Sequence, residues 1–413
     1  MKTRVLVISD SPFLNFDTSL YSYDLIKLLI KKDIAVYNLI LSTIVDTEYD
    51  YIKGDFSTLD KIHNDIGDVP EDDKELLKKV IYIYRCKNFI VDNAFVDSLI
   101  DSNEITLVIS CISITSNIRL SGKLKVPLIL NLKMDYNPIT KIHYDMINTA
   151  QVLISNTEHG NQSIIESLEQ VKEEERIIYR INPGIDFNEL DNVILNRKTI
   201  RSNLRKKLGI PEKCIVFYLD LNCINMADME RKCIDSSVKL FKEYLKENPN
   251  SFLLINSIIN TSLKDIVTVL KIPTSKYFII NDFYQDSSIK LRNMRRQLYV
   301  CSDILLGLSG GEDYNLSIIE SQYVGLPVLF NNITSYKEVK YLGTMNEKIQ
   351  QIYILGEIQS YVNMPIIRNC LERIRYMVKN YSKFRYNKDI SNKLRDIYSK
   401  DFEEKWDILL GGF

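Results

Sequence analysis

The chain lacks three features that would each assign it to a broad class of protein. It has no basic surplus, because 53 Lys and Arg residues face 54 Asp and Glu residues, and a general nucleic-acid binder needs such a surplus. Its longest apolar run, Ile105 to Ile114, has about half the length of a membrane span. Its N-terminus meets Asp10 after a short apolar run, too early for a signal peptide. We therefore expect neither nucleic-acid binding nor a transmembrane segment.

Cysteine and histidine occur in patterns that argue against common structural sites. The seven cysteines are scattered and form no CxxC pair, and the chain has only three histidines. We therefore predict no disulfide framework, no metal site and no cofactor, and we expect a reducing cytoplasm. The chain also lacks the GxGxxG, P-loop and GxSxG motifs, which argues against the common dinucleotide, nucleoside triphosphate and serine-hydrolase sites.

Glycine is scarce, so a cluster of glycines carries information. The chain has 14 glycines, and four of them lie between Gly307 and Gly325, where an even spread would place fewer than one. Alanine occurs only four times while Ile, Lys, Asn and Tyr abound, which is the bias of AT-rich coding. The segment from Gly307 to Gly325 is therefore the first candidate for a binding site.

Short, β-branched apolar runs alternate with amphipathic stretches in the first half of the chain, which predicts a parallel sheet covered on both faces. Residues 46–80 fit this pattern poorly, and Asp65–Glu75 is predicted to be a solvated loop. The predicted strands are Arg4–Ile8, Ile34–Leu41, Ile105–Ile112, Val126–Leu132, Val152–Ser155 and Ile177–Ile181, and the predicted helices are Thr18–Lys32, Phe95–Ile100, Ile142–Thr149 and Glu158–Leu168.

The same alternation restarts after a break at Asn182-Pro183-Gly184 and a charged stretch, Asn196–Lys207. The charged stretch is interpreted as a solvated helix face, and the alternative is contact with an anionic membrane or an acceptor. An amphipathic tail, Ile390–Leu410, carries the only tryptophan, Trp406. The predicted strands are Cys214–Asp220, Phe252–Asn256, Tyr277–Asn281, Ile304–Leu308 and Pro327–Phe330, and the predicted helices are Glu230–Leu245, Leu263–Leu270, Leu291–Val300, Leu316–Val324 and Ser335–Tyr341.

The glycine-rich segment has the physical features of an anion site. Strand Ile304–Leu308 leads through the glycine-rich loop into a helix that starts near Leu316. Glycines let the backbone approach a ligand, and a helix N-terminus offers unpaired N–H groups to phosphate. Glu312 in the loop and Glu320 in the helix can accept hydrogen bonds from sugar hydroxyls. The alternative is a glycine turn followed by a helix with an ordinary surface glutamate.

The stretch GGEDYNLSIIESQYVGLPVL resembles the donor-site signature of retaining glycosyltransferases of the GT-B fold, especially family 4. That signature is Glu, seven residues, Glu, then Gly-x-Pro-Val, and Glu312 and Glu320 have this spacing. The resemblance implies that Glu312 lies near the transferred sugar and that Glu320 binds the ribose hydroxyls. Backbone at Asn315, Leu316 and Ser317 would hold the sugar and diphosphate. Asp313 departs from the family pattern and is expected to alter sugar choice.

Other segments between about residues 150 and 345 resemble the family in the same order. In MERKCIDSSVKLFKEYLKENPNSFLLI, Arg231 and Lys232 would neutralise the departing diphosphate, and the alternative is an exposed helix start. NPGIDFNEL resembles the hinge segment, and VLISNTEHGNQSIIES resembles the end of the first domain. The first domain matches less well, since its first loop has no glycine. Asp135 is the candidate catalytic acid there, with a structural aspartate as the alternative.

The resemblance implies an α/β protein of the GT-B fold, with two facing Rossmann-like, doubly wound parallel-sheet domains. Residues 1–185 would form the acceptor side, residues 186–384 the donor domain, and residues 385–413 a helix that crosses back to the first domain. The implied activity is a retaining, metal-independent hexosyl transfer from a nucleoside diphosphate sugar to a glycan, protein or lipid. The alternatives are a catalytically weak sugar-nucleotide-binding subunit and a nucleotide-sugar epimerase.

Overall fold

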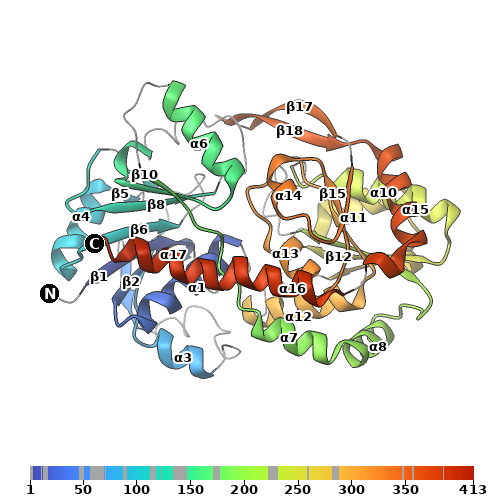
Figure 1. Cartoon of the computed structure of the whole chain (residues 1–413), viewed down its shortest axis with the longest axis horizontal. Helices are drawn as coiled ribbons and strands as arrows, with labels where there is room; N and C mark the ends of the chain where they lie inside the picture. The colour runs from blue at the N-terminus through green and yellow to red at the C-terminus, as the bar shows by residue number, and fades with distance from the viewer. Residues whose placement is uncertain are drawn as a thin grey trace.

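Two parallel sheets, each covered by helices on both faces, face one another in a computed structural model of the chain (Figure 1). A C-terminal helical segment runs across both halves and ends beside the first sheet (Figure 1). The structure describes residues 3–10, 12, 17–45, 51–55, 69, 71–86, 91–111, 118–120, 122–133, 147–170, 177–221, 231–257, 260–280, 288–346, 348–355, 358–384 and 386–413.

The N-terminal sheet alternates its side chains between two cores. Val5 and Val7 of β1 face one core together with α1, whereas Leu6 and Ile8 face the other with α4 and α6. All neighbouring strands are parallel except β3 and β4. In spatial order the strands are β10 (Ile177–Arg180), β9 (Val152–Ser155), β8 (Leu128–Leu132), β6 (Leu107–Cys111), β1 (Arg4–Ser9), β2 (Ala35–Val45), β4 (Ile81–Cys86) and β3 (Tyr51–Gly54). The other elements are α1 (Asp17–Lys31), α3 (Glu71–Leu77), α4 (Asn93–Asn103), α6 (Glu158–Gln170) and the short pair β5 (Val91–Asp92) and β7 (Ile118–Arg119).

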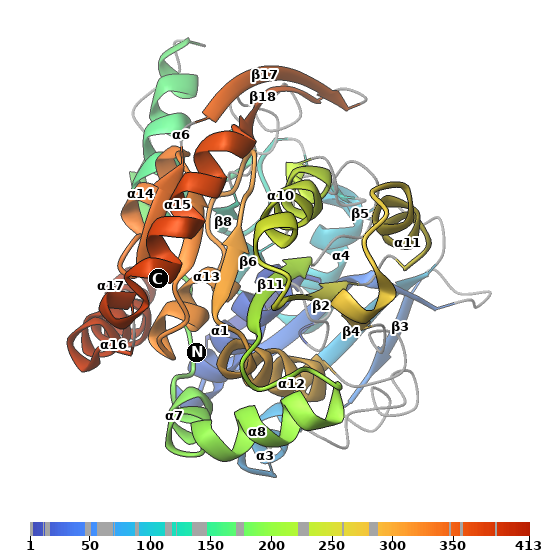
Figure 2. The same ribbon diagram turned by 90° about the vertical axis from the view of Figure 1, so that its right-hand side faces the viewer.

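The C-terminal sheet is wholly parallel, and its strand order reverses between β11 and β14. One face carries α10, α11 and α15, and the other carries α7, α12 and α13 (Figure 2). In spatial order the strands are β13 (Tyr277–Ile280), β12 (Ser251–Ser257), β11 (Ile215–Leu221), β14 (Ile304–Gly307), β15 (Val328–Asn331) and β16 (Gly343–Asn346). The helices are α7 (Asn188–Leu195), α8 (Arg197–Lys207), α10 (Ile234–Glu247), α11 (Asn260–Val269), α12 (Ser288–Cys301), α13 (Leu316–Tyr323), α14 (Thr334–Glu338) and α15 (Ile367–Lys379).

The C-terminal segment ties the two halves together at the hinge. It consists of α16 (Lys388–Arg395), a π-helical turn (Asp396–Lys400) and α17 (Asp401–Leu410). Trp406 is fully buried in the core of the N-terminal sheet. The Ile185 N–H donates to the Tyr398 carbonyl at 2.8 Å. A Cβ on Gly184 would lie only 3.0 Å from the Phe402 ring, so this glycine lets the hinge and α17 pack closely. The predicted crossing of the tail to the first domain is confirmed.

Some predicted elements are wrong. Of the stretch Asp65–Glu75, predicted to be a solvated loop, residues 65–68 and 70 lie outside the described part. Residues 71–75 are largely solvated, but they belong to α3, which begins at Glu71. Strands β3, β4 and β16 were not predicted. Neither was the antiparallel hairpin of β17 (Lys348–Leu355) and β18 (Ile358–Pro365). Of the predicted helix Ile142–Thr149, only residues 147–149 lie in the described part, and these are helical.

Two arginines of the basic segment in α8, Arg201 and Arg205, have a structural role that corrects the interpretation of the whole segment as a solvated face. Arg201 donates to the carbonyls of residues 300–302, at the end of α12, at 3.0 to 3.1 Å. Arg205 is only 2% exposed, and both arginines pair with Asp303. A cation at a helix C-terminus satisfies orphan carbonyls and the helix dipole. The exposed cations of this helix are Lys198, Lys206 and Lys207.

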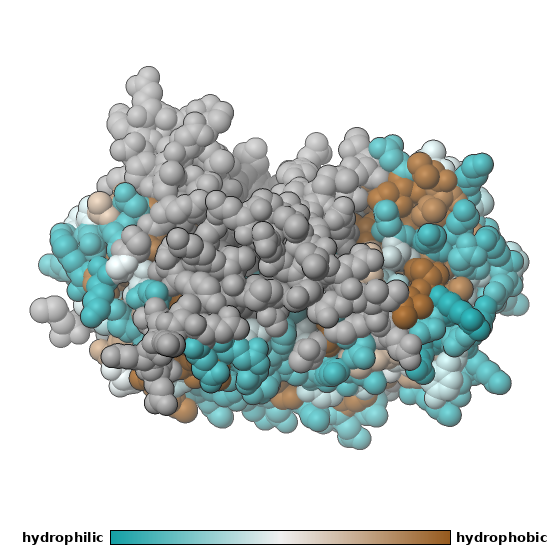
Figure 3. All heavy atoms as spheres, turned by 90° about the horizontal axis from the view of Figure 1, so that it is seen from above, coloured by the Kyte–Doolittle hydropathy of each residue, from teal (hydrophilic) through white to brown (hydrophobic). Residues whose placement is uncertain are grey.

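The described surface is predominantly hydrophilic on the face seen from above, with apolar groups gathered toward the end formed by the C-terminal sheet (Figure 3). In the part of the chain that the structure describes, no helix is both long enough and apolar enough to cross a bilayer.

The docking of α17 leads to a stability prediction. Trp406→Ala should lower the free energy of unfolding by about 3–5 kcal/mol, because it leaves a large cavity in the N-terminal core. Urea denaturation followed by circular dichroism measures this loss. Ile408→Ala is the matched control on the same helix, since Ile408 is 70% exposed and its removal should change little. Equal effects of the two substitutions would contradict the docking of α17.

Candidate functional site

The glycine-rich loop leads into a helix with both ends defined. Asn315 is the N-cap of α13, and its side chain accepts a hydrogen bond from the Ile318 N–H at 3.3 Å. Asn315 has an extended backbone with φ −136°. At the other end, Gly325 has φ +81°, and a Cβ there would lie 2.5 Å from the Tyr386 Cα. Only glycine fits this position, so the helix stops there.

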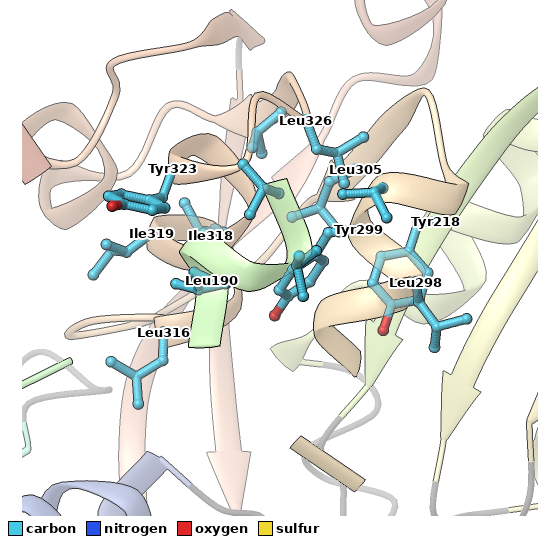
Figure 4. Close-up of a cluster of buried hydrophobic side chains, with 14 of the residues drawn as sticks. Leu190, Tyr218, Leu298, Tyr299, Leu305, Leu316, Ile318, Ile319, Tyr323 and Leu326 are labelled. Carbon is cyan, nitrogen blue, oxygen red and sulfur yellow. The ribbon is translucent and has the colours of Figure 1, made fainter. Parts of the chain in front are cut away.

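The apolar face of α13 fixes the helix in place. Leu316, predicted to be a donor-binding residue, is fully buried and lies with Ile319 and Tyr323 in the core beneath the helix (Figure 4). Leu190 of α7 and Tyr299 of α12 belong to the same core (Figure 4). The Leu316 side chain therefore supports the helix, and the donor-binding role predicted for the Leu316 backbone stays a prediction.

Glu312 lies in a buried ion-pair cluster with the two cations predicted for the diphosphate. Its Oε2 pairs with Arg231 Nη1, and its Oε1 pairs with Lys232 Nζ. Asn315 Nδ2 also donates to Oε1, at 3.2 Å. The Ser335 hydroxyl donates to the Glu312 carbonyl. The fold thus brings together Glu312, Asn315, Arg231 and Lys232, which come from two segments and which sequence patterns had assigned to one site.

The segment that carries the two cations is held tightly against the glycine-rich loop. Arg231 Nη1 donates to the Gly311 carbonyl at 2.7 Å, and the Arg231 carbonyl accepts from the Gly310 N–H at 2.6 Å. Cys233, two residues after Arg231, has a left-handed backbone with φ 51°. This conformation costs a non-glycine residue roughly 1–2 kcal/mol. Arg231 and Lys232 are 5% and 9% exposed, so the alternative of an exposed helix start is wrong.

Glu320 lies in a second buried cluster, formed with three arginines of α12. Its carboxylate oxygens are 3.0 Å from Arg296 Nη2, 3.2 Å from Arg295 Nη2 and 3.6 Å from Arg292 Nε. The Tyr299 hydroxyl donates to it at 3.2 Å. Burial raises the pKa of Glu320, but the three arginines outweigh this effect and lower that pKa to about 2. The side chain predicted to bind ribose is therefore surrounded by donors of the protein itself.

The arginine cluster links α13 to the segment that connects the two halves and to the N-terminal half. Arg296 pairs with Glu189 of α7 and donates to the Asp186 carbonyl at 3.2 Å. On α1, burial raises the pKa of Asp24 to about 6 against the opposing charge of Arg292. Charges from both halves of the chain therefore meet around α12.

A small cavity lies at the switch point between β11 and β14, where ligands of open α/β sheets bind. Its volume of about 20 Å³ is the space of roughly one water molecule. Asp220, at the end of β11, accepts hydrogen bonds from Ser317 Oγ and, at 2.7 Å, from Asn256 Nδ2. The polar residues that line the cavity are Asp220, Lys232, Ser309, Asn315, Ser317 and Tyr336.

The structure places most of the predicted site residues, and it adds others. Asp135 lies outside the described residues. Asp220 and Asn256 were not predicted, although a polar residue that ends a buried strand is a signal for them. Within the described ranges, no group of three or more His, Cys, Asp or Glu side chains is arranged to hold a metal ion.

Comparison with solved structures shows the fold. A glycosyltransferase from Rickettsia africae aligns with a TM-score of 0.64 over 99% of this chain and 97% of its own, at 14% identity. Sucrose-phosphate synthase from Thermosynechococcus elongatus aligns with a TM-score of 0.65 over 100% of this chain and 99% of its own, at 10% identity. The chain has the GT-B fold. A trehalose-6-phosphate structure from E. coli, bound with UDP-2-fluoro glucose, aligns with a TM-score of 0.62 over 99% of this chain and 98% of its own, at 9% identity. No family model and no curated protein sequence matches this chain significantly.

The Glu320 cluster predicts that the free energy of unfolding depends on pH. A pKa of about 2, against an ordinary 4.5, corresponds to about 3 kcal/mol of stability. Because the pKa is lowered in the folded state, this contribution is complete at neutral pH and is lost as the pH falls below about 4.5 toward 2. We expect Glu320→Gln to be about 3 kcal/mol less stable than the wild type at pH 7 and the difference to shrink as the pH falls. Urea denaturation at a series of pH values measures both.

Glu247→Gln is the matched control for this experiment. Glu247 pairs with Arg375 on the exposed surface, where an ion pair contributes little to stability. This variant should follow the wild type at every pH. A Glu320→Gln deficit that stayed constant from pH 7 to pH 3 would show that the carboxylate charge is not what stabilises the cluster.

Proposed function

We propose that the protein transfers a hexose from a nucleoside diphosphate donor to an acceptor hydroxyl with retention of configuration. The observation that carries this proposal is the buried cluster of Glu312, Arg231 and Lys232 beside the cavity at the switch point of the C-terminal sheet. The GT-B fold supports it, since neighbours of this fold include a glycosyltransferase and a structure bound with UDP-2-fluoro glucose.

The charges at the site suit a departing diphosphate. Arg231 and Lys232 carry two positive charges and Glu312 carries one negative charge, so the cluster keeps a net charge of +1. The N-terminus of α13 adds the positive end of a helix dipole. Negative charge grows on the diphosphate as its bond to the sugar breaks, and cations already in place stabilise that charge. In this proposal they act without a divalent metal.

The acceptor would complete the reaction from the N-terminal side. Its hydroxyl oxygen bonds to the anomeric carbon as the bond from that carbon to the diphosphate breaks, and the hydroxyl proton passes to the departing diphosphate. We assign Glu312 to the surroundings of the transferred sugar and Asp135 to the acceptor side. A glycan, protein or lipid acceptor in the cytoplasm stays a prediction, as does peripheral membrane contact.

A second candidate is a sugar-nucleotide-binding subunit with weak transferase activity or none. It is favoured by one observation: both oxygens of Glu312 already pair with the cations assigned to the diphosphate. A donor must therefore rearrange these contacts before it reacts. Binding and transfer have to be measured separately to distinguish the two candidates.

Removing one cation tests the donor site. Lys232→Met keeps the length of the side chain and removes its charge, so we expect affinity for nucleoside diphosphates to fall about 10- to 100-fold, the effect of a lost charged hydrogen bond. Titration calorimetry with UDP, GDP and ADP in the presence of EDTA measures this change. Lys206→Met, on an exposed position of α8, is the control and should bind like the wild type. Unchanged affinity in Lys232→Met, or binding that requires an added metal, would refute the assignment.

A substitution in the N-terminal domain tests whether the protein transfers sugar. We expect Asp135→Asn to lower transfer about 100-fold, the scale of a misplaced reactant, because Asp135 would orient the acceptor, and to leave nucleotide affinity unchanged. The assay follows transfer to acceptors from a host-cell extract alongside nucleotide titration. A wild type that binds nucleotide but transfers nothing, with a silent Asp135→Asn, would establish the binding-subunit candidate. Loss of nucleotide binding in Asp135→Asn would refute the division of roles between the domains.

A further inference from the structure

One turn of the N-terminal domain lies against the glycine-rich loop and against α14. The turn comprises residues 156 and 157, which connect β9 to α6, and residues 158 and 159, the first two of α6. Helices α6 and α14 face each other across the boundary between the two halves in both ribbon views (Figures 1 and 2). Two carboxylates of the C-terminal half reach this turn, and they come from different elements.

The first carboxylate is Asp313, the residue that departs from the family pattern. It is fully buried, and its Oδ1 accepts a hydrogen bond from the Thr157 hydroxyl. Its Oδ2 accepts from Asn156 Nδ2 at 3.3 Å. A Cβ on Gly160 would lie 3.0 Å from Asp313 Oδ1, so glycine permits this close approach. Asp313 thus faces the other domain, which argues against its expected role in sugar choice.

The second carboxylate is Glu338, at the end of α14. It accepts from the Glu158 N–H at 2.8 Å and from the His159 N–H at 2.9 Å. These are the first two N–H groups of α6, which have no partner within the helix. Arg180 of β10 lies 3.4 Å from the same carboxylate. Glu338 therefore caps a helix of the N-terminal domain from the C-terminal half.

The neighbours of Asp313 connect this contact to the site. Glu312 precedes it and pairs with Arg231 and Lys232, whereas Tyr314 follows it beneath Lys133 of the N-terminal domain, at 5.2 Å from the ring centre. Glu312 thus contacts its own half of the chain, whereas Asp313 and Tyr314, the next two residues, contact the N-terminal half. A movement of the turn away from Asp313 must shift the backbone next to Glu312.

We infer that Asp313 and Glu338 are positioning residues that dock the turn at residues 156–159 onto the donor loop and thereby fix the place of Glu312. The docking follows from the contacts alone, whereas its consequence for transfer rests on the proposed function. The two carboxylates act together, because both hold one short turn. Loss of either contact should release the other.

Hydrogen exchange tests the coupling directly. Thr157→Val removes one hydroxyl and keeps the shape of the side chain, and Asp313→Asn replaces an acceptor with an amide. Neither side chain accepts from the N–H groups of Glu158 and His159, yet both variants should speed exchange of those two amides by about tenfold or more, the effect of a lost charged hydrogen bond. The Thr157 hydroxyl also accepts from the Gly160 N–H at 2.9 Å, so faster exchange of Gly160 alone reports the loss of that cap. Faster exchange of residues 158 and 159 in Asp313→Asn, which keeps the cap, reports release of the turn. Thr157→Ser keeps the hydroxyl and should exchange like the wild type.

Glu247→Gln is the control, because it breaks a carboxylate–arginine pair within one domain and should leave these amides protected. Unchanged protection of residues 158–159 in Thr157→Val would overturn the inference. Thr157→Val keeps the inference testable if Asp313→Asn does not fold, since it only replaces a hydroxyl with a methyl group of similar size.

A kinetic measurement tests the consequence for the site. Thr157→Val should lower kcat of transfer by about tenfold and leave affinity for UDP, the probe, within about twofold of the wild type. A parallel loss of UDP affinity would overturn the positioning role. If the wild type transfers no sugar, the proposed function fails, and the exchange experiment still decides whether the turn is docked.

Discussion

Three carboxylates between residues 312 and 320, in the segment proposed to bind the donor, are buried. Each of them is satisfied by a different part of the molecule. Glu312 pairs with Arg231 and Lys232 of the same domain, Asp313 accepts hydrogen bonds from the N-terminal domain, and Glu320 lies among the arginines of α12. A buried carboxylate that loses its partner costs several kcal/mol. The loop and helix can therefore occupy only an arrangement that satisfies all three at once, and this constraint fixes the donor segment relative to both sheets.

The regular alternation of strands and helices was predictable because burial on both faces leaves a clear trace in the sequence. The apolar runs that became β1, β11 and β14 are examples. Helix α3 escaped prediction because its first turn is acidic, Glu71 to Asp73, which is typical of a loop as well as of a helix start. Its buried residue, Leu77, comes only at the end. The antiparallel strands β3, β17 and β18 do not follow the parallel pattern used for the prediction.

The site was predictable to the extent that a local motif encodes it. The spacing of Glu312 and Glu320 and the Arg231-Lys232 pair predicted one site, and the fold brings Glu312 and that pair together. The surroundings of Glu320 were not predictable, because Arg292, Arg295 and Arg296 lie three and four residues apart on one helix face, the usual pattern of a solvated surface. The packing of α12 against α7 and α13 buries that face.

The pairing of Glu312 with its two cations bears on how the site can work. Buried unpaired cations would repel one another and lose their hydration, so Glu312 makes it possible to keep Arg231 and Lys232 side by side in the interior. The carboxylate does not cancel them, since the net charge stays at +1 and the dipole of α13 adds to it. In the proposed reaction a diphosphate would therefore take over contacts to cations that are already oriented, and Glu312 would be released toward the sugar. Folding thus supplies the preorganisation on which electrostatic stabilisation of a leaving group depends.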